Sequence, residues 1–323
     1  MYPFKFRPIL KTVLWGGEKI IPYKQIESDQ KQVGESWELS GVKGNESVVA
    51  NGELAGTTLP ELLTREKERL LGKANYERFG NEFPLLIKFI DARQDLSIQV
   101  HPNDQLAWER HHSKGKTEMW YVVDADKGAH LRSGFAKQVT PAEYEASVAD
   151  NTITDILKDY EVHPGDLFFL PAGRVHSIGA GSFIAEIQQT SDITYRIYDF
   201  NRKGADGKPR ELHTELAKGA IDYTVLPDYR THYKAEKNEL TELISCPYFT
   251  TSLCELDEEK TFDFASLDSF VVFICVEGRG MVEDNEGHKL EVHQGETLLL
   301  PATTRSLRVK PEGKLKFLTS WIA

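Results

Sequence analysis

One stretch of the chain is repeated 130 residues further on, and this repeat constrains the fold more than any other feature. Gly165-Asp-Leu-Phe-Phe-Leu-Pro-Ala172 is echoed by Gly295-Glu-Thr-Leu-Leu-Leu-Pro-Ala302. Each copy contains a glycine and an acid that form a turn, an apolar triplet typical of a buried strand, and a Pro-Ala pair where the strand ends. The repeat therefore favours a duplicated β-barrel.

Most apolar runs in the chain are short, rich in β-branched and aromatic residues, and bounded by Gly, Pro, Asp or Asn. This pattern is typical of β-strands. The chain has no Gly-rich phosphate-binding loop and no alternation of strands with helices, so a doubly wound sheet is not expected. We predict a mainly β fold. The expected strands are Phe83 to Ile90, Met119 to Val123, Asp166 to Leu170, Ser182 to Ile187, Phe270 to Cys275 and Leu315 to Trp321.

Helical signals are fewer, and the helices are expected to cover the barrels rather than form a layer of their own. Two capping boxes, Thr58-Leu-Pro-Glu61 and Thr140-Pro-Ala-Glu143, predict helix starts, and the first opens the run from Leu59 to Leu71. Asp104 to His111 and His213 to Tyr223 are predicted to be short helices.

Charge and cysteine content exclude some classes of partner. The net charge is −11, which argues against binding to nucleic acid or to an anionic membrane surface. The N-terminal segment has no long apolar run, so neither a signal peptide nor a membrane span is expected. The three cysteines, Cys246, Cys254 and Cys275, form no C-x-x-C motif. We therefore predict a cytoplasmic protein with reduced thiols.

A second motif begins at the first copy of the repeat. Gly165-x5-Pro171-x-Gly173-x2-His176 matches the second motif of the cupin barrel in full. Gly165 forms the turn into one strand, Pro171 and Gly173 form the turn that ends it, and His176 begins the next strand with its imidazole facing the interior. Together with the repeat, this motif predicts two cupin-like jelly-roll barrels with a few covering helices.

The partners of His176 are expected on two neighbouring strands. Gln99 and His101 are two residues apart, so both side chains face the same side of a strand. Glu118 enters the next strand. Two imidazoles, a carboxylate and an amide oxygen form a nitrogen and oxygen site that suits zinc, manganese, cobalt or iron better than copper(I) or an iron–sulfur cluster. Ordinary cupins have a His-x-His pair and a short gap between it and the glutamate. This chain departs from that pattern, because Gln99 replaces the first histidine and sixteen residues separate His101 from Glu118.

With these departures, the sequence resembles the type I mannose-6-phosphate isomerases, also called phosphomannose isomerases, in their short bacterial form. The resemblance runs through the first two thirds of the chain, and its most specific part is Ser-Ile-Gln-Val-His-Pro with the downstream Lys-x-Glu. The segments that carry it are Gly34 to Ser40, Phe83 to Asp91, Leu96 to Asn103, Gly115 to Trp120, Leu170 to His176 and Ser191 to Phe200.

The resemblance implies a function and roles for particular residues. It implies a metal-dependent interconversion of mannose 6-phosphate and fructose 6-phosphate, with Arg196 as a catalytic residue near the metal. Ser97 and a basic residue after Arg196 are implied as the phosphate-binding group; similar enzymes can carry Lys there, whereas this chain has Arg202, followed by Lys203. The implied zinc ligands are Gln99, His101, Glu118 and His176.

Aldose–ketose isomerisation moves a proton between C1 and C2 through an enediolate. It needs a base, an electrophile for the oxygen that becomes anionic, and a group that binds the remote phosphate. Lys116 is two residues before Glu118 and is expected to reach the pocket, while Asp192 could orient Arg196 or act as an acid or base. Glu186 and Tyr121 are further candidates, and the residues alone leave the proton carrier open.

Two other functions are compatible with the same residues. An iron-dependent cupin oxygenase would use two histidines and a carboxylate, but Gln99 would consume a position that oxygen and substrate need. A sugar-phosphate-binding cupin sensor without catalysis is the second alternative, because cupins support many functions. The expected partner is a small phosphorylated sugar, and the sequence leaves the oligomeric state open.

The second barrel is predicted to bind no metal. The repeat offset places Ser306 at the position of His176 and Thr303 at that of Gly173. His288 and His293 lie near Gly-rich turns, where solvent exposure is expected. We predict one zinc per chain, with manganese or cobalt as substitutes. Charged sequence around Asp228 to Glu239 indicates the boundary. Residues 1–235 are expected to form the catalytic metal-binding cupin domain with helical insertions, and residues 236–323 the second, degenerate barrel.

Overall fold

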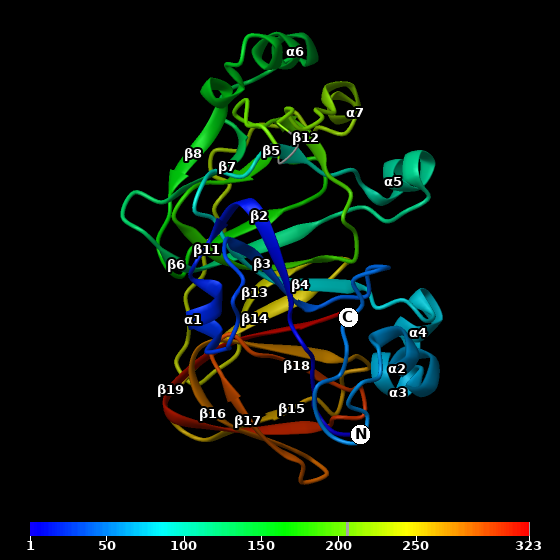
Figure 1. Ribbon diagram of the computed structural model, residues 1–323. Helices are drawn as coiled ribbons and strands as arrows, with labels where there is room; N and C mark the ends of the chain where they lie inside the picture. The colour runs from blue at the N-terminus through cyan, green and yellow to red at the C-terminus, as the bar shows by residue number, and fades with distance from the viewer. Residues whose placement is uncertain (205–206, 323) are drawn as a thin grey trace.

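The computed structural model describes residues 1–204 and 207–322, and its strands form three sheets. Figure 1 shows two groups of strands, one above the other, with α6 and α7 at the far end of the upper group and α2 to α4 beside the junction. No helix in the described part of the chain is both long and apolar enough to cross a membrane. The prediction of a mainly β fold built from two barrels is confirmed.

The upper barrel consists of a five-stranded and a six-stranded sheet. Leu131 and Ile178 from the first sheet share a buried apolar cluster with Trp120 and Phe168 from the second, so the two sheets pack face to face. The first sheet has the order β12-β5-β10-β7-β8 and contains β5 (Ile98–Val100), β7 (His130–Phe135), β8 (Leu157–Glu161), β10 (His176–Ile178) and β12 (Tyr195–Tyr198). The second has the order β2-β3-β4-β11-β6-β9 and contains β2 (Ile9–Gly17), β3 (Val33–Leu39), β4 (Leu85–Asp91), β6 (Glu118–Ala125), β9 (Leu167–Leu170) and β11 (Ser182–Gln189).

The lower barrel is built from an eight-stranded sheet. Its first strand comes from the start of the chain, since Phe4 in β1 pairs with Leu299 in β18. The N-terminal residues therefore belong to the sheet of the lower barrel, and the division of the chain near residue 236 stays a prediction. The strands are β1 (Phe4–Lys5), β13 (Thr241–Ser245), β14 (Thr250–Leu256), β15 (Lys260–Asp263), β16 (Val271–Asp284), β17 (Lys289–His293), β18 (Thr297–Leu300) and β19 (Ser306–Trp321).

The repeat that we identified in the sequence is a repeat in structure. Its apolar triplets lie in β9 and β18. The leading glycines, Gly165 and Gly295, have φ angles of 94° and 81°, which only glycine adopts without strain. Ser306 begins β19, as His176 begins β10. The second barrel therefore keeps the strand and the first turn of the motif but has a serine where the first barrel has a ligand.

The two barrels meet across a shared apolar core. Ile87 and Phe89 from β4 belong to the same buried cluster as Val272 and Ile274 from β16. Burial of such side chains contributes about 1.5–3 kcal/mol each. The junction is therefore an extensive part of the folded chain rather than a loose contact between separate units.

Seven short helices and one 3-10 turn surround the sheets in the described residues. Both predicted capping boxes are present. The single helix predicted from Leu59 to Leu71 is interrupted, because Lys67 has a φ angle of 50° and separates two helices. The helix predicted from His213 to Tyr223 is shorter, since Gly219, a poor helix former, follows its last residue. The elements are α1 (Ile20–Lys24), α2 (Leu59–Glu66), α3 (Glu68–Leu71), α4 (Lys73–Phe79), α5 (Asp104–His111), α6 (Pro141–Ala149), η1 (Ile153–Ile156) and α7 (Thr214–Lys218).

Candidate metal centre and substrate cavity

Three buried side chains converge between the two sheets of the upper barrel. His101 follows β5, His176 begins β10, and Glu118 begins β6 on the opposite sheet. One nitrogen or oxygen atom from each lies within 4.8 Å of the others. Gly173, with a φ angle of 94°, forms the turn before His176, as the motif predicts. These residues form a group that can hold a metal ion.

Hydrogen bonds of the two imidazoles direct their free nitrogens toward Glu118. Nδ1 of His101 lies 2.8 Å from the Ile193 carbonyl oxygen, and Nδ1 of His176 lies 2.8 Å from the Arg174 carbonyl oxygen. A carbonyl can only accept, so both Nδ1 atoms carry the proton and both Nε2 atoms keep a lone pair. The Nε2 atoms lie 3.5 and 3.2 Å from the carboxylate oxygens of Glu118. Backbone carbonyls commonly orient metal-bound histidines in this way.

The protonation states also suit metal binding. Burial lowers the pKa of His101 well below its usual value, and the Lys116 ammonium lowers it further. Burial likewise lowers the pKa of His176, to about 3. Both imidazoles are therefore neutral at pH 7, which is the form that binds metals.

Glu118 and Gln99 provide the test of whether the site fits a cation. Both carboxylate oxygens of Glu118 are buried; Oε2 faces the Lys116 ammonium at 2.7 Å, while Oε1 has no hydrogen-bond partner. The Oε1 side of this buried carboxylate is therefore free to bind a second cation. The amide of Gln99 lies 3.4 Å from Nε2 of His176, and rotation by 180° exchanges its nitrogen and oxygen. The residues present thus fit a divalent metal, with Gln99 in reach of the group.

Lys116 is the cation nearest the ligand atoms. Its ammonium lies 2.7 Å from Oε2 of Glu118 and 3.2 Å from Nε2 of His101. The side chain is 5% exposed. The prediction that Lys116 reaches the pocket is supported by this geometry, and its catalytic role stays a prediction.

A cavity of about 350 Å³ lies beside these residues. Ser97, Asp192 and Arg196, which we singled out from the sequence, all line it together with Gln99 and Lys116. Arg202 is not among the lining residues. The other lining residues are Val13, Trp15, Glu35, Lys88, Ile90, Leu96, Ile178, Glu186, Thr194 and Arg210.

Strand register explains why these side chains meet. Gln99 in β5 is paired with His176 in β10 on one side and with Arg196 in β12 on the other. Directly paired residues project from the same face of a sheet. The candidate ligand His176, the amide of Gln99 and the guanidinium of Arg196 therefore lie in one row across three adjacent strands.

The opposite wall carries an ion pair between Glu186, one of the further candidates from the sequence, and Lys88, which was not among them. Nζ of Lys88 lies 3.2 Å from Glu186 and 3.7 Å from Glu35, and Trp120 Nε1 donates to Glu186 at 2.9 Å. Lys88 was the available signal, because it is the one charge within the apolar run from Leu85 to Ile90. Tyr121, another sequence candidate, packs into the junction core instead.

Arg196 is held by a segment that follows it in the chain. Its Nη1 donates to the Glu211 carbonyl at 2.9 Å, so Glu211 orients the guanidinium in the structure. Its backbone N–H donates to Nδ1 of His213 at 3.1 Å, and the His213 N–H donates to the Arg196 carbonyl at 2.7 Å. Asp192, which we expected to orient Arg196, lines the same cavity, and its role stays a prediction.

His213 is expected to position Arg196. His213→Ala removes the acceptor of the Arg196 N–H, so kcat should fall about threefold to tenfold, the effect of one net hydrogen bond, with KM little changed. His213→Asn offers an amide oxygen to the same N–H and should restore most of the loss. Steady-state kinetics and thermal unfolding of both variants check this. An equal loss of kcat in both, in step with lost thermal stability, would indicate a general structural role.

The histidines of the second barrel are engaged elsewhere. Nδ1 of His288 lies 2.8 Å from Asp284, and Nε2 of His293 lies 3.6 Å from Glu296. Within residues 1–204 and 207–322, His101, Glu118 and His176 form the single group that could hold a metal.

The double variant His288→Ala, His293→Ala should therefore keep both its metal content and its kcat. Elemental analysis should return close to one metal per chain, as in the unaltered protein. Two metals per unaltered chain, or loss of activity in the double variant, would show that the second barrel has a metal site after all.

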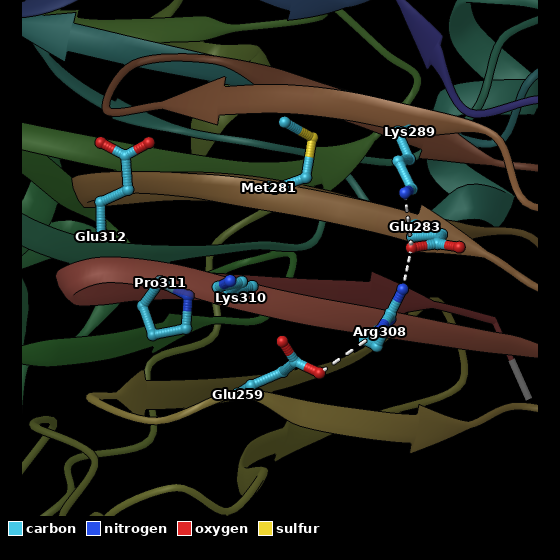
Figure 2. Close-up of a pocket in the computed structure, with 8 residues that line it drawn as sticks. All are labelled: Glu259, Met281, Glu283, Lys289, Arg308, Lys310, Pro311 and Glu312. Carbon is cyan, nitrogen blue, oxygen red and sulfur yellow. Dashed lines mark hydrogen bonds and ion pairs between the residues drawn. The ribbon is translucent and has the colours of Figure 1, made fainter.

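A second cavity, of about 480 Å³, lies on the sheet of the lower barrel (Figure 2). Arg308 contacts both Glu283 and Glu259 there, and Lys289 lies near Glu283. The cavity is lined by Glu259, Met281, Glu283, Lys289, Arg308, Lys310, Pro311 and Glu312, none of which belongs to the candidate metal centre.

The fold and the site define a metal-binding protein of the cupin class. Two family models match the chain: the catalytic domain of phosphomannose isomerase type I over residues 4–130, and the cupin domain of mannose-6-phosphate isomerase over residues 238–320. Mannose-6-phosphate isomerase ManA of Bacillus subtilis is 35% identical over 302 residues, which are 93% of each chain. The chain belongs to the type I mannose-6-phosphate isomerases.

Further relatives are similar to this chain along almost its whole length. Mannose-6-phosphate isomerase of Streptococcus mutans is 32% identical over 95% of this chain and 94% of its own. The crystal structure of a mannose 6-phosphate isomerase from Bacillus subtilis superimposes with a TM-score of 0.87 at 28% identity, covering 99% of both chains. A putative mannosephosphate isomerase from Archaeoglobus fulgidus has a TM-score of 0.81 at 23% identity over 100% of this chain and 99% of its own, which shows the shared fold.

Proposed function

We propose that the chain interconverts mannose 6-phosphate and fructose 6-phosphate as a metal-dependent aldose–ketose isomerase. The observation that carries this proposal is the cavity beside the ligand group, which is lined by the cationic side chains of Lys116 and Arg196. The proposed substrate is taken from the names of relatives that match 93% or more of the chain, which are mannose-6-phosphate isomerases. A cation-lined cavity suits a phosphorylated sugar because phosphate binds charged donors most strongly.

We propose that one zinc ion is held by Gln99, His101, Glu118 and His176, with manganese or cobalt as substitutes. Two nitrogen donors with a carboxylate and an amide oxygen suit these metals. The bound cation supplies a Lewis acid that stabilises negative charge on a substrate oxygen.

The remaining chemistry belongs to side chains on the cavity wall. A proton leaves C2 of the aldose and a proton is returned to C1, so negative charge develops on oxygen in between. Lys116 and Asp192 are the groups that we assign to proton transfer, because both line the cavity and both can gain or lose a proton. Arg196 keeps its charge and stabilises the developing anion.

Specific features favour the isomerase over the other two candidates. An iron oxygenase needs open positions at the metal for oxygen and substrate, and Gln99 in reach of the ligand group takes one of them. A sensor has no need of buried acid and base groups such as Lys116 beside the ligands. We also propose a reducing, cytoplasmic location, supported by three cysteines that are free in the structure.

A coupled assay tests the proposal. Mannose 6-phosphate is supplied to the zinc-loaded chain, and fructose 6-phosphate is converted to glucose 6-phosphate and measured by NADPH formation. We expect turnover that is much faster than with free mannose. Binding of the sugar phosphate without product would favour the sensor, and consumption of oxygen would favour the oxygenase.

A further inference from the structure

Three arginines gather at one end of the cavity around a single buried carboxylate. Asp199, which follows β12, is 4% exposed. Its Oδ1 accepts from Nη2 of Arg202 and from Nη2 of Arg210, each at 2.5 Å, and its Oδ2 accepts from Nε of Arg210 at 2.7 Å. Arg210 therefore binds Asp199 with two parallel hydrogen bonds, a geometry that fixes the plane of its guanidinium.

The charges at this end do not balance. Arg196, Arg202 and Arg210 carry three positive charges, and Asp199 neutralises one. Burial lowers the pKa of Arg196, the positive charges of Arg210 and Arg202 lower it further, and the carboxylates of Asp199 and Glu211 raise it, so Arg196 is within electrostatic range of both other arginines. Nε of Arg196 is also buried without a hydrogen-bond partner. An excess of arginines over buried carboxylates, with one unused donor, suits a phosphate dianion.

The position of this cluster suits the far end of a sugar phosphate. In the antiparallel pair of β5 and β12, Arg196 is opposite Gln99 and Tyr198 is opposite Ile98. Continuing the pairing brings Ser97 beside Asp199. Ser97 is two residues from Gln99, or roughly 7 Å along a strand. A substrate with its reacting carbons near the candidate metal centre thus extends toward Ser97 and the arginines.

Arg202 and Arg210 differ in what they face. Both bind Asp199, but Arg210 lines the cavity and Arg202 does not. The Arg210 side chain is 29% exposed and that of Arg202 is 17% exposed. In addition, Nε of Arg202 donates to the Asp199 carbonyl at 3.3 Å. Arg202 is thus turned toward the backbone, while one edge of Arg210 remains available at the cavity.

We propose that Arg210 is the arginine that contacts the phosphate of the substrate, and that Asp199, which also pairs with Arg202, positions it. This inference rests on the proposed function, and it transfers the direct contact predicted for Arg202 to Arg210. Asp199 fixes the Arg210 guanidinium through two hydrogen bonds, so little side-chain freedom is lost when phosphate binds. Arg202 keeps Asp199 neutralised, which preserves the positive charge of Arg210 for the ligand.

The test compares Arg210→Ala with Arg202→Ala, which removes a guanidinium from the same carboxylate. Binding of mannitol 6-phosphate, an open-chain sugar phosphate that cannot isomerise, is measured by calorimetry on the metal-loaded protein, alongside free mannitol. We expect Arg210→Ala to weaken the phosphate ester about 10- to 100-fold and Arg202→Ala less than about threefold. Arg210→Lys keeps the positive charge but lacks the planar set of guanidinium donors, so its affinity for mannitol 6-phosphate should lie between those of Arg210→Ala and the unaltered chain.

Kinetic and folding controls complete the test. KM for mannose 6-phosphate should rise in Arg210→Ala by a similar factor, and in Arg202→Ala by less than about threefold. Thermal unfolding and metal content of both variants identify any loss of fold. Three results would overturn the assignment. Arg202→Ala could weaken binding more than Arg210→Ala does, Arg210→Ala could weaken mannitol and mannitol 6-phosphate equally, or folded Arg210→Ala could bind mannitol 6-phosphate as tightly as the unaltered chain. Because calorimetry needs no turnover, the assignment can fail while the isomerase holds, or hold while the isomerase fails.

Discussion

His176→Ala is expected to lose the bound metal together with about 1000-fold or more of kcat. The substitution removes one of the two imidazoles whose Nε2 atoms face Glu118, so the remaining ligands hold a cation far less tightly. A Lewis acid contributes several kcal/mol to stabilising a developing anion, and each 1.36 kcal/mol corresponds to a tenfold change in rate. Elemental analysis after dialysis and the coupled assay measure the two losses on one sample.

His163→Ala is the matched control, since the side chain of His163 is 69% exposed and lies outside the candidate metal centre. Its metal content and kcat should equal those of the unaltered chain. Full activity of His176→Ala in a sample shown to be free of metal would contradict the assigned site.

Arg196→Lys should lower kcat about 100-fold, with KM and metal content nearly unchanged. Lysine keeps the positive charge but lacks the planar donor fork, and loss of one donor to a developing oxyanion costs about 100- to 1000-fold in kcat. Because such an interaction forms mainly in the transition state, ground-state binding is little affected. Steady-state kinetics with mannose 6-phosphate provide both constants.

Arg132→Lys serves as the comparison for Arg196→Lys. Arg132 lies in the same five-stranded sheet, where it pairs with Asp95 at 3.0 Å and does not line the cavity. We expect unaltered kcat and KM for this variant. If Arg196→Lys changed KM alone, Arg196 would belong to the phosphate-binding group rather than to the reacting carbons.

The local geometry around His101 and His176 could be predicted from the sequence, because it depends on neighbouring residues. Period-two alternation places Gln99 and His101 on one face, and the turn through Gly173 determines where His176 begins its strand. The capping box at Thr140 likewise predicted α6 from neighbouring residues alone. In each case the interacting residues are within a few positions of one another.

Features that depend on distant pairings were not predictable in the same way. Arg210 could not be assigned from the sequence, because its proposed role depends on a chain path that returns it to Asp199, eleven residues earlier. The ion pair of Lys88 depends on the pairing of β4 with β11, which places Lys88 opposite Glu186. The contribution of β1 to the lower barrel connects residues almost three hundred positions apart. Single-sequence patterns contain no information on such contacts.

The junction of the barrels suggests why a barrel without metal ligands is retained. β4 faces Lys88 into the cavity and, on its other side, places Ile87 and Phe89 in the shared core with Val272. The lower barrel thus covers the apolar side of a strand that carries cavity residues on its polar side. We expect the lower barrel to act structurally, by burying that surface and supporting the cavity wall.

Metal titration of the metal-free chain tests the central claim most directly. Zinc is added stepwise, and bound metal and turnover of mannose 6-phosphate are recorded on each sample. We expect turnover to rise in proportion to bound zinc and to level off at one zinc per chain. Turnover that is already complete without metal, or that levels off only at two zinc ions per chain, would contradict the account.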